Sequence, residues 1–194
     1  MTTWIWATDA NAGPAGAMTW LVTAPTSYAS GWLAPYTPVY SMASVQVTSV
    51  PDMVTKVLAA AGSDKIERLI LYGHAFHGAQ AVGCGPAINL KSTTNDFLAV
   101  SASTGTLTNG AEHDLARLVP QLAPNARVSL GGCNIAAPPD GQALLIRIST
   151  ALGGITVEGG TWTQTSLFPG YEGPVVRCTG NSCTTIYGPS KEIR

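Results

Sequence analysis

The sequence has little charge. Of its 194 residues only 11% are Asp, Glu, Lys or Arg, whereas 45% are hydrophobic, and the formal net charge is -1. No cluster of Lys and Arg occurs anywhere, so the chain lacks a positive stripe that could follow a phosphate backbone. We therefore expect no nucleic-acid partner. With so few charges, Ser, Thr, Asn and Gly must hydrate the surface.

Long hydrophobic runs are also missing. The longest of them, such as residues 68–72, have the length of a strand, whereas a membrane-spanning helix needs about 20 apolar residues. We expect no membrane partner. The N-terminus has no positive stretch before an apolar one and already carries Asp9, so we also expect no cleaved signal peptide. This leaves a cytoplasmic protein, an excised mature domain, or cargo of a secretion route that uses no such signal.

Several motifs of known chemistry are absent. The sequence contains no G-x-S-x-G, no H-E-x-x-H and no P-loop. A zinc site would need a second close Cys pair or an H-x3-5-H pattern, and neither occurs. We expect no metal and no cofactor. Cys178 and Cys183 flank a turn-rich stretch between β-prone runs, so a disulfide across a hairpin is favoured for this pair.

The hydrophobic pattern predicts one α/β domain spanning residues 1–194. Apolar residues recur at helical spacing after Pro51 and before Gly62, whereas residues 66–73 form an almost unbroken apolar run typical of a buried strand. Strands that alternate with helices favour a mainly parallel central sheet flanked by helices. The predicted segments are β-prone pieces at 19–23 and 39–48, loops and a hairpin at 75–109, a helix at 111–122, a strand at 126–130, a helix from 138 to 152, a strand at 155–158, and a β-rich C-terminus with a hairpin.

Two residues with catalytic potential follow predicted core strands. His74 comes just after the strand at 66–73, and Cys133 follows the strand at 126–130. Binding sites in parallel sheets form outside the carboxyl ends of the strands, so these side chains should meet at one edge. A neighbouring imidazole can hold a cysteine as its reactive thiolate and later protonate a leaving amine. Main-chain N–H groups at Ala75 and Cys133 could bind the oxyanion, because the preceding glycines permit a sharp turn.

Two segments resemble the His and Cys motifs of caspase-like cysteine peptidases, a group that includes caspases, gingipains, clostripain, separase and bacterial CHAT-type domains. They read LYGHAFHG at 71–78 and VSLGGCNIA at 128–136. The resemblance covers about residues 66–162 and implies a caspase-like fold, a His74–Cys133 dyad, a covalent acyl-enzyme and a polypeptide substrate. The family usually has Gly directly after the His. Ala75 retains the N–H at that position, but it would not satisfy a need for a backbone angle that only Gly adopts.

Four further residues are candidates for substrate binding. The carboxylates of Glu158 and Asp140 could pair with a basic substrate side chain, and Asp9 is a weaker acidic candidate. Glu158 is favoured because its strand should end beside the Cys133 strand, although a solvated carboxylate is an equal alternative. Trp162 could form a wall of the same site, or it could serve only in packing.

Simpler interpretations exist for the reactive side chains. A cysteine at a strand end is most often an inert small hydrophobe, and that interpretation would hold for Cys133 without His74. His77 is interpreted as a loop residue, His113 as a solvated helix residue, and Cys84 as an incidental thiol. Two functions therefore compete: a cysteine endopeptidase, and a catalytically inactive caspase-like module that binds a partner.

Overall fold

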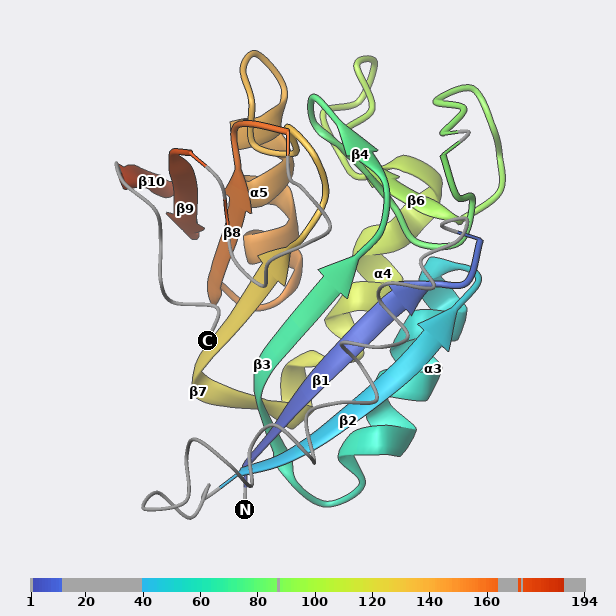
Figure 1. Ribbon diagram of the computed structural model, residues 1–194, viewed down its shortest axis with the longest axis vertical. Helices are drawn as coiled ribbons and strands as arrows, with labels where there is room; N and C mark the ends of the chain where they lie inside the picture. The colour runs from blue at the N-terminus through green and yellow to red at the C-terminus, as the bar shows by residue number, and fades with distance from the viewer. Residues whose placement is uncertain (1, 12–39, 87, 164–170, 172, 187–194) are drawn as a thin grey trace.

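A mostly parallel seven-stranded sheet organises the part of the chain described by the computed structural model, residues 2–11, 40–86, 88–163, 171 and 173–186 (Figure 1). Its order is β10-β9-β8-β7-β3-β1-β2. Strands β2, β1, β3, β7 and β8 are parallel, and β9 and β10 continue the sheet antiparallel. The strands are β1 (Thr2–Asp9), β2 (Tyr40–Val47), β3 (Lys65–Tyr72), β7 (Leu122–Leu130), β8 (Thr156–Gly160), β9 (Val175–Thr179) and β10 (Ser182–Ile186). The prediction of an α/β fold with a mainly parallel central sheet is confirmed.

Strand β1 is the element that the sequence did not predict. Ile5 and Ala7 pack into the helix-covered core, whereas Trp6 packs with Ile70 on the opposite face. Because both faces of β1 carry apolar groups, the strand lacks the polar alternation that marks a half-buried strand. The predicted piece at 39–48 is confirmed as β2, and the piece at 19–23 lies outside the described residues.

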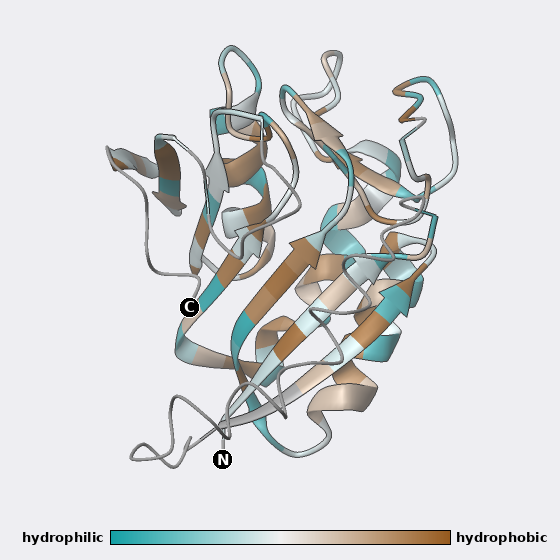
Figure 2. Ribbon diagram, in the orientation of Figure 1, coloured by the Kyte–Doolittle hydropathy of each residue, from teal (hydrophilic) through white to brown (hydrophobic). Residues whose placement is uncertain are grey.

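The described α-helices pack on one face of the sheet (Figure 1). They are α3 (Val50–Ala61), α4 (Ala111–Ala116) and α5 (Gly141–Ala151), and their buried residues share one core with the strands. Figure 2 shows β3 coloured hydrophobic toward its carboxyl end, where it crosses this core. The helix expected at 111–122 is shorter: α4 ends at Ala116, and Pro120 lies in a short 3-10 turn, η2 (Val119–Gln121). A proline has no N–H for a longer helix at that position. None of the described helices is long and apolar enough to cross a membrane.

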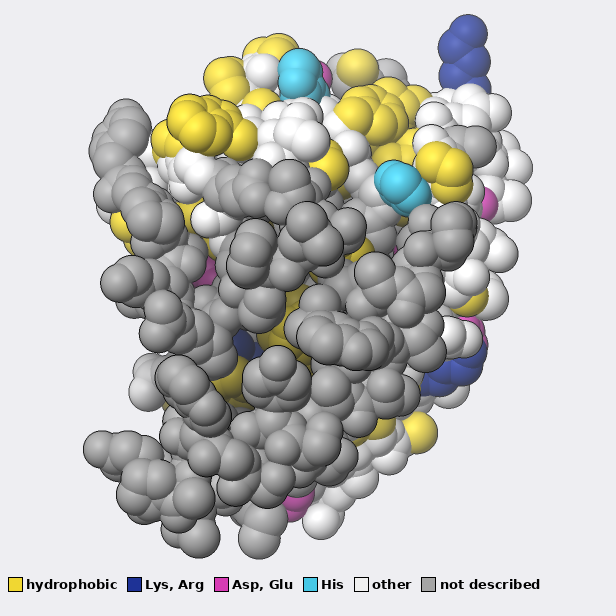
Figure 3. All heavy atoms as spheres, in the orientation of Figure 1, with side chains coloured by type: hydrophobic (Ala, Val, Ile, Leu, Met, Phe, Trp, Pro, Cys, Tyr) yellow, Lys and Arg dark blue, Asp and Glu magenta, His cyan; other side chains and the backbone are white. Residues whose placement is uncertain are grey.

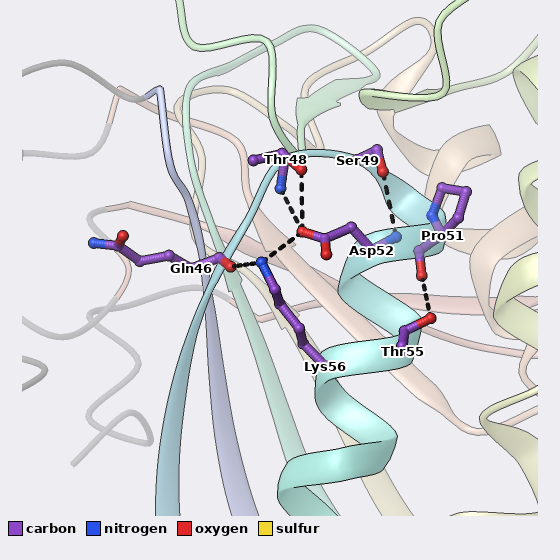
Figure 4. A network of polar contacts seen from close by, with 7 residues as sticks. All are labelled: Gln46, Thr48, Ser49, Pro51, Asp52, Thr55 and Lys56. Carbon is purple, nitrogen blue, oxygen red and sulfur yellow. Dashed lines mark hydrogen bonds and ion pairs between the residues drawn. The ribbon is translucent and has the colours of Figure 1, made fainter.

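The start of α3 is fixed to the carboxyl end of β2 by a polar network (Figure 4). The Ser49 hydroxyl accepts a hydrogen bond from the Asp52 N–H at 3.2 Å, which caps the helix. The Asp52 carboxylate accepts bonds from the Thr48 N–H and hydroxyl and from Lys56, which also reaches the Gln46 carbonyl. The hydrogen bond from Lys56 is the largest cause of a lowered pKa at Asp52. These contacts hold one edge of the sheet at the end where His74 and Cys133 emerge.

A second, small antiparallel sheet follows β3 directly. It has the order β4-β5-β6, with β4 (Ala75–Phe76), β5 (Ala79–Ala81) and β6 (Phe97–Ala99), and the short turn η1 (Thr108–Gly110) comes later in the same region. This agrees with the loops and hairpin expected at 75–109. The sheet lies beyond the carboxyl ends of the parallel strands (Figure 1). The residues after His74 therefore have a defined conformation.

The C-terminal hairpin extends the central sheet instead of decorating its outside. Cys178 and Cys183 are register partners in β9 and β10, and they form the predicted disulfide. Cys178 is fully buried in the main core, and the Gly180 N–H at the turn donates to Ser149 of α5 at 2.8 Å. The disulfide therefore closes a hairpin that is already packed against a helix.

Removing this disulfide should destabilise the protein moderately. The bridge closes a short loop, with a sequence separation of 5, so the entropy that it removes from the unfolded chain corresponds to about 2 kcal/mol. We expect the Cys178→Ser/Cys183→Ser variant to lose about that free energy of unfolding, measured by urea denaturation under oxidising conditions. Wild-type protein with reductant is the control and should lose a similar amount. An unchanged denaturation midpoint in both samples would contradict the prediction.

Candidate functional site

The pairing of β3 with β7 brings His74 and Cys133 to the same edge of the sheet. The two strands are adjacent and parallel, and Leu71 is the register partner of Leu130. His74 is the third residue after Leu71, and Cys133 is the third residue after Leu130. The Gly131 N–H donates to the Leu71 carbonyl at 2.7 Å, so the strands stay joined up to the turn before Cys133. Both residues thus leave neighbouring strands at matched positions.

The hairpin after His74 contacts the segment around Cys133 at two points. A Cβ built on Gly132 would lie 2.2 Å from the Ala75 Cβ, so the two main chains approach as closely as glycine permits. At the hairpin tip, the Gly78 N–H donates to the Ile135 carbonyl at 3.2 Å. Because these contacts lie on either side of Cys133 in sequence, they hold the hairpin that follows His74 against the Cys133 turn.

The edge formed by these segments is accessible. His74 is exposed and Cys133 is half-buried. Figure 3 shows histidine and hydrophobic side chains together at the upper edge of the molecule, over the ends of the strands. Tyr72 lies beneath this edge, where its ring faces Gly131. Burial raises the pKa of the Tyr72 phenol, and the negative charge of a Cys133 thiolate raises it further, so the phenol stays protonated beside the sulfur.

The main chain at Ala75 can supply an oxyanion donor. Its φ is not among the positive values recorded for the described non-glycine residues, so this position does not need Gly. The Ala81 N–H donates to the His74 carbonyl at 2.8 Å, which makes the Ala75–Gln80 pair the non-hydrogen-bonded kind in the β4–β5 ladder. The Ala75 N–H therefore points away from β5.

Two of the predicted substrate-binding residues lie at this edge. The Trp162 carbonyl accepts from the Asn134 N–H at 2.9 Å, so Trp162 stands beside the residue that follows Cys133. Its side chain is 60% exposed, and its ring packs on Gly173, where a Cβ would meet it at 2.3 Å. Asp140 is exposed directly before α5 and contacts Gly78 at the tip of the hairpin. Both residues therefore lie near the segments that carry His74 and Cys133.

Glu158 is placed differently from what the sequence suggested. It is only 2% exposed, and its Oε1 accepts from the Ser129 hydroxyl at 2.8 Å. Its Oε2 accepts from Arg177 Nε at 3.0 Å and Nη2 at 2.9 Å, and Arg127 Nη1 lies 3.7 Å away. The carboxylate is therefore occupied by protein groups across β7, β8 and β9. Its burial argues against a substrate-binding role and also against the alternative of a solvated carboxylate.

The remaining acidic, histidine and cysteine candidates either had no catalytic role predicted from the sequence or are bound by protein groups. Asp9 is 3% exposed and accepts bonds from the N–H groups of Asn11 and Gly85. His77 is exposed at the hairpin tip, and His113 is exposed on α4, as expected. Burial, followed by the nearby carboxylates, raises the pKa of the Cys84 thiol to about 11. Within the described ranges, no three His, Cys, Asp or Glu side chains gather as a metal site.

Gln80 is the one residue of this region that the sequence did not indicate. It is fully buried in β5, and its Nε2 donates to the carbonyls of His74 and Ala81. A single Gln between two alanines in a short segment carries no pattern that separates it from a surface residue. Its importance arises only from the folded position next to His74.

Comparison with protein-family models, with curated proteins and with solved structures found no match to this chain. The chemistry of the site is therefore interpreted from the geometry of its own residues.

Replacing Glu158 should cost stability. Glu158→Gln removes the negative charge and leaves Arg177 and Arg127 near a buried neutral amide, so we expect a loss of about 2–3 kcal/mol in the free energy of unfolding. The partial exposure of both arginines keeps this below the full cost of breaking a buried pair. Glu67→Gln is the matched control, because that half-buried carboxylate accepts one hydroxyl bond from Thr2, and it should change stability by about 0.5 kcal/mol or less. Equal losses in urea denaturation would contradict the prediction.

The two free cysteines should react differently with iodoacetamide. Since the pKa of Cys84 is raised to about 11, its reactive thiolate is scarce at neutral pH and increases only as the pH approaches that value. We expect peptide mass spectrometry to find Cys133 modified first at pH 7.5, with Cys84 modified appreciably only above about pH 10. Faster modification of Cys84 at pH 7.5 would overturn this assignment.

Proposed function

We propose that this protein is a caspase-like cysteine endopeptidase that uses His74 and Cys133 as a catalytic dyad. One observation carries the proposal: the adjacent parallel strands β3 and β7 lead into these two residues at matched register, and the hairpin after His74 packs on the glycine turn before Cys133. A nucleophile and a base that act together need such a shared edge. The caspase-like character of the motifs at 71–78 and 128–136 agrees with the same assignment.

The proposed reaction has two stages. The His74 imidazole takes the proton of the Cys133 thiol, and the thiolate sulfur attacks the carbonyl carbon of the scissile peptide bond. The N–H groups of Ala75 and Cys133 donate to the resulting oxyanion. The carbon–nitrogen bond then breaks, and the imidazolium gives its proton to the leaving amine. Water, deprotonated by His74, attacks the thioester, and the sulfur leaves as the new carboxylic acid forms.

Trp162 and Asp140 are the proposed substrate contacts. The exposed Trp162 ring offers an apolar wall beside Cys133, and its packing on Gly173 fixes the ring orientation. Asp140 offers a negative charge near the hairpin tip, where it could pair with a basic substrate side chain. A polypeptide substrate suits these contacts because it presents apolar and charged side chains along one extended strand.

The competing function, an inactive caspase-like binding module, rests on Ala75 in place of Gly. The backbone at Ala75 does not adopt a positive φ, so the substitution leaves the N–H in place without strain. The conformation of Ala75 thus supports the active enzyme over the inactive module.

Loss of either dyad residue should abolish most hydrolysis. Cys133→Ala removes the nucleophile, so we expect no cleavage above background in a fluorogenic library that varies the residue before the scissile bond. His74→Ala should lower kcat about 10²- to 10⁴-fold because the general base is lost. The double variant should be no slower than Cys133→Ala, since residues that act as a unit are not additive.

Matched controls separate catalysis from folding. Cys84→Ala and His113→Ala remove a second thiol and a second imidazole outside the site, and both variants should retain wild-type kcat. Circular dichroism should show the same fold in all variants. Cleavage by Cys133→Ala at the wild-type rate would refute the peptidase proposal.

A further inference from the structure

A buried glutamine joins the two halves of the candidate site. Gln80 is 0% exposed, and its Nε2 lies 3.1 Å from the Ala81 carbonyl oxygen and 3.4 Å from the His74 carbonyl oxygen. Its strand partner is Ala75, whose methyl group packs on Gly132. Gln80 therefore lies between the main chain of His74 and the turn that leads to Cys133.

The orientation of the Gln80 amide follows from these bonds. Only its NH₂ group can donate to the carbonyls of His74 and Ala81, so Oε1 must point the other way. Oε1 lies 2.8 Å from a Cβ built on Gly132. A flipped amide would place oxygen against two carbonyl oxygens, which is unfavourable.

The Oε1 atom is a buried acceptor without a hydrogen-bond partner among the described residues. A buried polar atom in this state costs free energy, and an apolar residue of similar size would avoid that cost. The NH₂ group of Gln80 donates to two carbonyls, whereas its Oε1 has no such partner among the described residues. The unsatisfied acceptor therefore points to a role at the turn that it faces.

We propose that Gln80 is a positioning residue for the dyad, a role that rests on the proposed peptidase function. Its NH₂ group fixes the His74 main chain, and its Oε1, which faces Gly132, receives a main-chain N–H of this turn in the substrate complex. Hydrogen bonds in active sites are often long before substrate binds and shorten in the complex. The Cys133 N–H then stays directed at the oxyanion while the imidazole is held beside the sulfur. A small misplacement of either group lowers the rate steeply.

The test compares two glutamines with the same bonding pattern. Gln80→Met keeps the side-chain volume and removes both donations and the acceptor. Gln121→Met is the matched control, because the Gln121 Nε2 also donates to two main-chain carbonyls, those of Gly62 and Asp64, far from the dyad in the fold. We expect Gln80→Met to lower kcat about 10- to 100-fold with KM changed less than about twofold. Gln121→Met should keep the wild-type kcat and KM.

Alkylation of Cys133 provides a readout that does not require a peptide substrate. The rate at which Cys133 reacts with iodoacetamide at pH 7.5 should be lower in His74→Ala than in the wild type. The decrease in Gln80→Met should be smaller. If Gln80→Met does not fold by circular dichroism, Gln80→Glu replaces it, because a carboxylate keeps the shape but cannot make the two donations.

The outcomes distinguish the two proposals. In one outcome, alkylation of Cys133 is slower in His74→Ala, but the folded Gln80 variant keeps the wild-type alkylation rate and the wild-type kcat. This outcome would overturn the role of Gln80 and leave the dyad intact. An unchanged alkylation rate in His74→Ala would overturn the dyad itself, and with it the role of Gln80. A loss of kcat in Gln121→Met equal to that in Gln80→Met would assign the effect to general destabilisation and also overturn the positioning role.

Discussion

The parallel pairing of β3 with β7 is the constraint on which the candidate site depends. It sets Leu71 opposite Leu130 and so fixes where each strand ends. A shift of this register by one residue would turn every side chain of one strand to the other face, which the buried Leu71 and Leu130 prevent. The apolar core on the helix-covered face therefore determines that His74 and Cys133 emerge side by side. Burial in the sheet therefore places both residues at one edge of the fold.

Close contacts at glycine residues then keep the loops after β3 and β7 in the same relative position as the strands. Gly132 fits against Ala75 without room for a side chain, and Gly73 lies against the Asp9 side chain in the same way. Gly73 before His74 and Gly132 before Cys133 do more than permit a turn, because the lack of a side chain lets each segment pack closely on its neighbours. The Ala75 methyl group fills the space that Gly132 leaves open.

The sequence was sufficient to predict an element wherever the burial of that element's own apolar residues determines its structure. The unbroken apolar run of β3 and the spacing of α3 were predicted because burial requires those patterns. The prediction failed wherever contacts with residues distant in the sequence determine the structure. The β1 strand carries tryptophans and small residues on its two covered faces, so its pattern is not that of an ordinary strand. Glu158 was expected at the site, but the arginines that bury it come from β7 and β9, and their pairing cannot be deduced from spacing.

The two residues of the proposed dyad are held by different kinds of structure. The strand before Cys133 is connected to β8 and β9 by the Ser129–Glu158–Arg177 contacts, all of them at buried or half-buried positions. Beyond β9 the disulfide closes the hairpin, so this part of the sheet is cross-linked through its side chains. His74 instead precedes a two-stranded hairpin that reaches the Cys133 segment through glycine contacts and a main-chain bond to Ile135. Fewer side-chain links restrain the hairpin, so its position depends more on each of them. The buried Gln80 amide, which donates to the carbonyls of His74 and Ala81, is one of the side-chain links that restrain this hairpin.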